Sequence, residues 1–300
     1  MSDAYKLKPV VKSYIWGGNF FQKFGKESEE SISELWEMSA RGEDSSIIVS
    51  GPNKGKRLAD VLTNEDIGPV YKRFPYFPLL IKLIDAESDL SVQVHPSDEY
   101  ALKYDNSFGK CEMWYIIDSD EGSGIYIGLK NNSSREEIEQ KVNDGTILDC
   151  LNFVKVKPGD TFIINPGTIH AIGHGVRLIE IQQNSNLTYR LFDYNRIDKN
   201  GKKRELHILK ALDVIDYNKY EFKKIESDIL ADCKYFRVFK EEVNGSWIID
   251  ANQDSFATFT FLSGNGYVDD IPYKKFDTFF VPHGKKCEIK GSGTIIISGV

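Results

Sequence analysis

A run of short apolar segments, closely punctuated by turn residues, is the feature of this sequence that most constrains its fold. The run begins near Phe153, and its segments are 154–156, 161–164, 177–182 and 187–192. Pro-Gly and Asn-Ser pairs separate the segments, and both pairs favour tight turns. Short strands at such close intervals are typical of an antiparallel β-barrel or sandwich. The sequence therefore predicts a mainly β protein.

Other patterns predict a few helices and additional strands. Helices are predicted at 97–106, with Asp98 and Glu99 favourably placed in the first turn, and at 134–143, with Ser134 as its cap. Further helical segments are predicted at 57–73 and 204–215. Strands are predicted at 33–39 and 76–85, and 110–118 is expected to pair with 124–128.

An internal echo suggests two related β units. Residues 160–167 read DTFIINPG, and residues 277–284 read DTFFVPHG. His170 lies ten residues after the first Asp, whereas Cys287 lies ten residues after the second. We therefore expect a catalytic unit at 1–217 with helical segments, and a smaller, metal-free β unit of structural role at 218–300.

Composition excludes several classes of function. The formal net charge of −7 argues against nucleic acid or an anionic membrane as the main partner. No apolar run approaches the roughly 20 residues of a membrane span, and the start at Met1 shows no signal-like pattern, so a cytoplasmic location is expected. The four cysteines show no CxxC spacing, which favours reduced thiols. The oligomeric state is not indicated.

The segment 90–98 contains a candidate half of a metal site. Gln93 and His95 are two residues apart on a predicted strand, so both side chains project to the same side. Pro96 then ends the strand, because it cannot donate a ladder hydrogen bond. The alternative is that both are polar residues on a solvated strand face.

Glu112 and His170 are the candidates for the other half. The order Pro-Gly turn, apolar strand, Pro-Gly turn and His170 is typical of a cupin-like metal site, and Glu112 is the best placed carboxylate. Such a nitrogen and oxygen ligand set suits Zn²⁺ and also Fe²⁺ or Mn²⁺. His174, four residues after His170, is a weaker candidate because Ile172-Gly173 intervene.

Two cations complete the candidate site. Lys110 lies two residues before Glu112 and so shares its strand face, and Arg190 lies on the alternating segment 187–192. A solvated surface charge is the alternative for each. His207 and His283 are interpreted as structural. No phosphate-binding nucleotide loop of the P-loop or GxGxxG type is present.

Several blocks of this sequence resemble the type I mannose-6-phosphate isomerase family, in its short bacterial form. They are the blocks at 14–18, 34–39, 78–82, 90–98, 109–113, 165–170 and 189–194. The resemblance implies a cupin-type β-barrel fold, with a second degenerate β unit. It also implies one metal ion bound by Gln93, His95, Glu112 and His170, with Arg190 in the active site and Lys110 beside the ligand Glu112.

The resemblance further implies the reversible conversion of mannose 6-phosphate to fructose 6-phosphate, through a cis-enediol at a single zinc ion. The partner is then a phosphorylated hexose. The general base stays open between Lys110, a metal-bound hydroxide and a neighbouring residue. Two other functions stay open as well, a metal-dependent cupin oxygenase and a non-catalytic sugar-binding cupin.

Overall fold

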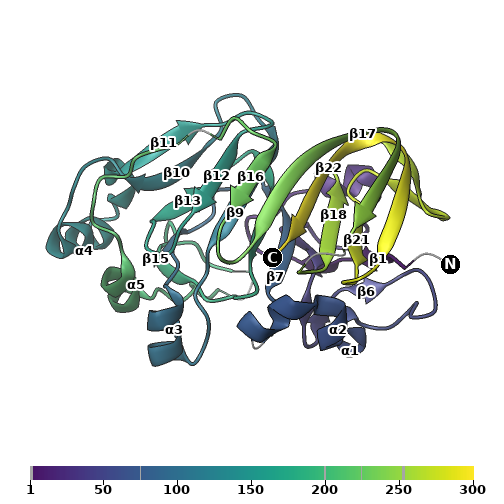
Figure 1. Ribbon diagram of the computed structural model, residues 1–300. Helices are drawn as coiled ribbons and strands as arrows, with labels where there is room; N and C mark the ends of the chain where they lie inside the picture. The colour runs from purple at the N-terminus through teal and green to yellow at the C-terminus, as the bar shows by residue number, and fades with distance from the viewer. Residues whose placement is uncertain (1–2, 75, 199–200, 224, 252–253) are drawn as a thin grey trace.

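The protein is mainly β and antiparallel, as the sequence predicts. A computed structural model describes residues 3–74, 76–198, 201–223, 225–251 and 254–300. Figure 1 shows two β-rich halves side by side, with α3, α4 and α5 on one half and α1 and α2 below the other. No helix in these described ranges is long and apolar enough to cross a membrane.

The first half consists of two open antiparallel sheets, which do not close into a barrel. The six strands of one sheet are, in spatial order, β12 (Thr161–Ile164), β9 (Glu112–Ser119), β14 (Val176–Gln183), β7 (Leu79–Ala86), β3 (Glu34–Met38) and β2 (Val10–Lys12). The five strands of the other are β11 (Leu151–Lys155), β10 (Gly124–Leu129), β13 (His170–Ile172), β8 (Val92–Val94) and β15 (Tyr189–Phe192). A two-stranded ribbon, β4 (Ala40–Arg41) with β5 (Asp44–Ser45), lies apart from them.

The two sheets pack against each other through apolar side chains. Trp114, Ile116 and Leu178 of the six-stranded sheet share one buried cluster with Ile125 and Ile127 of the five-stranded sheet. Because β7 and β14 lie centrally in their sheet, every residue of both strands is buried. β7 accordingly reads as a mostly apolar segment, whereas β14 also buries four polar residues, Arg177, Glu180, Gln182 and Gln183.

The predicted pairing of 110–118 with 124–128 is wrong. The strands themselves exist as β9 and β10, but β9 pairs with β12 and β14, whereas β10 pairs with β11 and β13. The turn between them therefore passes from one sheet to the other. The physical reason is that Trp114 and Ile127 share one core between the sheets, which buries both better than a surface hairpin would.

The predicted helices exist, but several are shorter than predicted and one is broken into short pieces. The predicted helices at 97–106 and 134–143 are confirmed as α3 (Asp98–Asp105) and α4 (Arg135–Asn143), the latter with a capping box of Ser134 and Glu137. The segment 57–73 breaks into α1 (Leu58–Val61), α2 (Asn64–Ile67) and a 3-10 helix, Pro69–Arg73. Two further 3-10 helices are Phe21–Phe24 and Ile147–Cys150. The last helix, α5 (Ile208–Val214), starts four residues later than predicted.

The second half is one large antiparallel sheet that takes strands from both ends of the chain. Its main path is β16 (Ile229–Asp232), β17 (Arg237–Asp250), β22 (Lys286–Gly299), β18 (Ala257–Phe261), β21 (Thr278–Val281), β1 (Tyr5–Lys8) and β6 (Ile47–Ile48). Off this path lie β19 (Asn265–Val268) and β20 (Ile271–Lys274). A division at residues 217 and 218 stays a prediction, and β1 and β6 join the first fifty residues to the C-terminal sheet.

Candidate metal centre and its cavity

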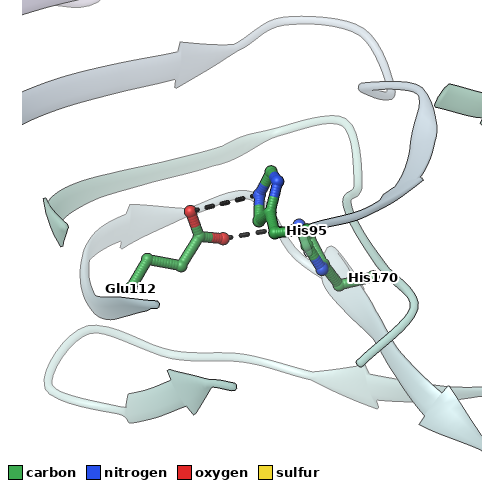
Figure 2. Close-up of side chains that lie close together, drawn as sticks. All are labelled: His95, Glu112 and His170. Atoms are coloured by element: carbon green, nitrogen blue, oxygen red, sulfur yellow. Dashed lines mark ion pairs between the residues drawn. The ribbon is translucent and has the colours of Figure 1, made fainter. Parts of the chain in front are cut away.

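Three predicted ligands meet at one buried point between the two sheets of the first half. His95 follows β8, Glu112 begins β9 and His170 begins β13. One potential ligand atom from each lies within 4.8 Å of the others, and all three residues are fully buried. Figure 2 shows the carboxylate and the two imidazole rings turned toward one another. The fold thus brings together residues that are 75 positions apart in the sequence.

Backbone carbonyls fix the orientation of both histidine rings. The Nδ1 atom of His95 lies 3.0 Å from the Leu187 carbonyl oxygen, and that of His170 lies 2.9 Å from the Thr168 carbonyl oxygen. A carbonyl oxygen only accepts, so each Nδ1 carries the proton and each Nε2 presents a lone pair to the cluster. This arrangement of outer hydrogen bonds is typical of metal-binding histidines.

The charges at the cluster also suit a cation. Burial, together with the neighbouring Lys110, lowers the pKa of His95 to about 3, and burial lowers the pKa of His170. Although burial opposes ionisation of Glu112, the neighbouring Lys110 holds its pKa well below the usual range. The cluster therefore presents two neutral imidazoles and one carboxylate.

Several polar atoms of the cluster are buried without a hydrogen-bond partner in the described part of the chain. His95 Nε2 and both Glu112 carboxylate oxygens are buried and make no hydrogen bond within the described residues. The imidazole nitrogens instead lie 3.5 and 3.4 Å from the Glu112 oxygens. Buried polar atoms without hydrogen bonds are costly, unless a metal or other ligand meets them. These residues fit a divalent metal ion.

Gln93 lies beside the cluster in a position to serve it. Its carboxamide nitrogen is 3.3 Å from His170 Nε2, and the two residues are directly paired between β8 and β13. The amide oxygen, which is the atom that binds cations, belongs to the same planar group, and a half-turn of that group exchanges the two atoms. Its assignment as a fourth ligand stays a prediction.

A cavity of about 420 Å³ opens next to the cluster. Gln93 and Lys110 line it, and each also contacts the cluster, Lys110 through an ion pair of 2.8 Å with Glu112. Trp16, Ile84 and Leu90 supply apolar wall, whereas Asn186 and Thr188 add polar groups. A mixed cavity of this size is suited to a small polar ligand.

Arg190 lines the same cavity with an uncompensated charge. Its Nε donates to Ser91 Oγ at 3.2 Å, and its Nη1 donates to the Glu205 carbonyl oxygen at 2.8 Å. Within the described part of the chain, no carboxylate forms an ion pair with it, and burial lowers its pKa. A half-buried guanidinium without a carboxylate partner is suited to an anionic ligand.

A chain of charges behind Lys110 was not predicted from the sequence. Glu180 Oε1 lies 3.1 Å from Lys82 and 3.4 Å from Lys110, while its Oε2 accepts from Trp114 Nε1 at 3.0 Å. Lys82 also lies 3.5 Å from Glu34. The available signal was Lys82 itself, because a lysine within a fully buried strand requires anionic partners.

Of the remaining three histidines, the one that lies near the site is not the one that the sequence predicts. His174 is exposed and stands outside the cluster. His283 lies in a turn of the second half, where its backbone N–H donates to the Asp66 carbonyl oxygen. His207, which was interpreted as structural, lies on the cavity wall with Arg190. The four cysteines are free thiols, as expected, and Cys111 is buried in the core.

Comparison with known proteins gives consistent matches. The family model described as phosphomannose isomerase type I, catalytic domain, matches residues 4–122. The chain is 37% identical to mannose-6-phosphate isomerase ManA of Bacillus subtilis, over 97% of each chain, and 33% identical to mannose-6-phosphate isomerase of Streptococcus mutans, over 99% and 98%. The crystal structure of the Bacillus subtilis mannose 6-phosphate isomerase superposes with a TM-score of 0.88 at 34% identity, covering 99% of both chains.

Proposed function

The chain belongs to the type I phosphomannose isomerase family, and on that premise we propose that it interconverts mannose 6-phosphate and fructose 6-phosphate. One observation of the chain's own structure carries the proposal. The buried cluster of His95, Glu112 and His170 adjoins a cavity whose wall holds the cations Lys110 and Arg190. An aldose–ketose isomerase needs both features, because negative charge develops on the sugar oxygens as the proton moves. A cytoplasmic location stays a prediction.

We assign one divalent metal ion, Zn²⁺, to His95, Glu112, His170 and Gln93. Neutral imidazoles and one carboxylate match the preferences of Zn²⁺, and the same set is compatible with Fe²⁺ or Mn²⁺. When bound, the ion supplies Lewis-acid polarisation of the sugar carbonyl. Glu112 Oε1 and His95 Nε2, which are buried without a hydrogen bond among the described residues, support this assignment independently of the relatives.

Arg190 and Lys110 have separate roles in the proposed isomerisation. The reaction moves one proton between C1 and C2 through a cis-enediol. Arg190 binds the anionic enediolate or the phosphate, since its charge is not neutralised by a carboxylate of the described residues. Lys110 lies between Glu112 and Glu180 and forms an ion pair with each, so it is suited to donate a hydrogen bond to a substrate oxygen. The base stays open between Lys110, a bound hydroxide and a neighbour such as Glu180.

A coupled assay tests the proposal directly. Purified protein is given mannose 6-phosphate, and fructose 6-phosphate is converted by coupling enzymes to an absorbance signal. We expect turnover that is lost after chelation and returns with added Zn²⁺. Oxygen uptake in an electrode, with Fe²⁺ in place of Zn²⁺, would instead indicate a cupin oxygenase. Sugar phosphate binding without turnover would indicate a binding protein.

A further inference from the structure

Four side chains form a row that leads from the metal cluster along the cavity wall. His170 pairs directly with Gln93 between β13 and β8, and Gln93 pairs directly with Arg190 between β8 and β15. Directly paired residues in an antiparallel sheet point to the same face. His207 lies next to Arg190 on the other side of β15, which is the edge strand of this sheet. The row is therefore His170, Gln93, Arg190 and His207.

The segment that contains His207 covers the open edge of β15. The His207 backbone N–H donates to the Arg190 carbonyl oxygen at 2.8 Å, and the Glu205 carbonyl oxygen accepts from the Arg190 guanidinium at 2.8 Å. In the third bond, the imidazole is the acceptor: the Arg190 backbone N–H donates to His207 Nδ1 at 3.3 Å. Three hydrogen bonds thus fix Arg190 at both its backbone and its side chain.

The third bond determines which nitrogen of His207 carries the proton. A backbone N–H only donates, so Nδ1 must be the unprotonated acceptor and the proton of the neutral ring lies on Nε2. This is opposite to His95 and His170, whose Nδ1 atoms are protonated and whose Nε2 atoms present lone pairs. Burial lowers the pKa of His207, which is consistent with a neutral ring.

Among the described residues, no carboxylate lies within hydrogen-bonding distance of the Nε2–H of His207. The nearest is Glu205, whose Oε2 lies 3.9 Å away and whose side chain is 83% exposed. The ring itself is only 29% exposed and lines the cavity. A donor fixed on a cavity wall, with no carboxylate to accept from it, is suited to meet an oxygen atom of a ligand.

We propose that His207 is a substrate-binding residue of the isomerase: Nε2–H donates to the sugar phosphate, and Nδ1 positions Arg190. The inference rests on the proposed function for the identity of the substrate. Adjacent strands are about 4.8 Å apart, so His207 stands roughly 14 Å along the row from His170. With C1 and C2 at the metal, His207 meets the phosphate-bearing end of the substrate.

Two amide substitutions of His207 test the roles of Nδ1 and Nε2 separately. In His207→Asn, the side-chain oxygen can replace Nδ1 as acceptor, but no donor reaches the position of Nε2. In His207→Gln, the amide nitrogen can replace the Nε2 donor, but the acceptor at Nδ1 is lost. We expect His207→Asn to raise the KM for mannose 6-phosphate roughly tenfold or more, with kcat within about twofold of wild type. We expect His207→Gln to keep KM and to lower kcat by about tenfold, because Arg190 is less well fixed.

His174→Asn is the matched control, since His174 is an exposed histidine outside the cavity. It should leave both constants unchanged. Identical kinetic defects in His207→Asn and His207→Gln, or wild-type constants in both, would overturn the proposal. Melting temperature and metal content of each variant show whether it is folded.

A second measurement works without any variant and without turnover. Long-range ¹H–¹⁵N spectra of the ¹⁵N-labelled wild-type protein report the tautomer of each of its five histidines. We expect His207 as the Nε2–H tautomer, with its Nε2 resonance shifting on addition of 1,5-anhydromannitol 6-phosphate, which cannot isomerise. An Nδ1–H tautomer, or no shift on saturation, contradicts the proposal. Absence of isomerase activity in the wild type would count against the proposed function, whereas the tautomer tests His207 separately.

Discussion

The two halves of the molecule contain the same local structure with different contents. In the first half, the Lys157 backbone N–H donates to the Asp160 carboxylate at 2.9 Å just before β12, and in the second half Lys274 donates to Asp277 at the same distance before β21. The sequence echo at 160–167 and 277–284 is therefore also a structural one. A shared turn and strand do not by themselves make a site.

The difference lies in the residues beyond the shared strand and in the side chains that face it. In the first half the chain continues to His170, which meets His95 and Glu112 from other strands. In the second half the position ten residues after the Asp is Cys287, a buried residue of an apolar cluster. The same cluster contains two stacked aromatic pairs, Phe259 with Phe279 and Phe261 with Tyr273. Aromatic rings thus pack the interior of the second half.

The largest effect is expected at His170, one of the two positions that distinguish the halves. His170→Ala removes one proposed metal ligand and should lower kcat by on the order of 10³-fold or more, together with metal content. Cys287→Ala is the matched change and should leave activity and metal content unchanged. The measurements are the coupled assay and metal analysis of the purified variants. Full metal content in His170→Ala would contradict the assignment.

Arg190 provides the second test of the comparison. Arg190→Ala should lower kcat by about 10²–10³-fold while the metal stays bound, because the role proposed for Arg190 is to stabilise negative charge and not to bind the metal. Arg237→Ala removes an exposed arginine of β17 and serves as the control. The assignment of Arg190 fails if the variant turns over at the wild-type rate.

The sequence was a good guide to the candidate ligands of the first half and a weaker guide to which strands and charges pair with one another. Period-two spacing placed Gln93 and His95 on one face of a strand, and Pro-Gly turns drew attention to His170, because both signals depend on local geometry. Their combination into one ligand set also needed Glu112 and the family resemblance, and Gln93 as a ligand stays a prediction. Partners between distant strands were not predictable. The sheet change between β9 and β10, and the Glu180 bridge between Lys82 and Lys110, depend on long-range packing. The strands β1 and β6 joined the second half for the same reason.

A smaller effect is expected from the aromatic core of the second half. Phe259→Leu should lower the free energy of unfolding by about 1 kcal/mol, since it removes ring contacts from a packed interior. Activity well below the melting temperature should be unchanged. Phe153→Leu, at a side chain that is 45% exposed, is the control and should change stability by less than about 0.5 kcal/mol. Loss of metal in Phe259→Leu would show that the halves are not independent.

The smallest effect concerns the contact between the halves. Lys26 donates to Glu37 and to the Phe276 carbonyl oxygen, each at 2.7 Å. Burial raises the pKa of Glu37, although Lys26 opposes the shift. Because the pKa of Glu37 is raised in the folded state, the stability of the wild type falls as pH rises above the ordinary pKa of a glutamate. Glu37→Gln has no titrating group at this position, so its stability does not fall for this reason.

The melting temperature of Glu37→Gln relative to wild type should therefore increase from about pH 4.5 to about pH 7. Thermal melts at several pH values measure it. A relative melting temperature that decreases with pH would mean that Lys26 dominates and that the pKa is lowered.

The central claim is that one metal ion, bound in the first half only, supports the isomerase activity of the chain. Titration of the chelated protein with Zn²⁺, with isomerase activity recorded at each addition, tests it most directly. We predict a linear rise in activity that reaches its plateau at one Zn²⁺ per chain. Activity that survives complete metal removal, or a plateau that requires two ions per chain, would contradict it.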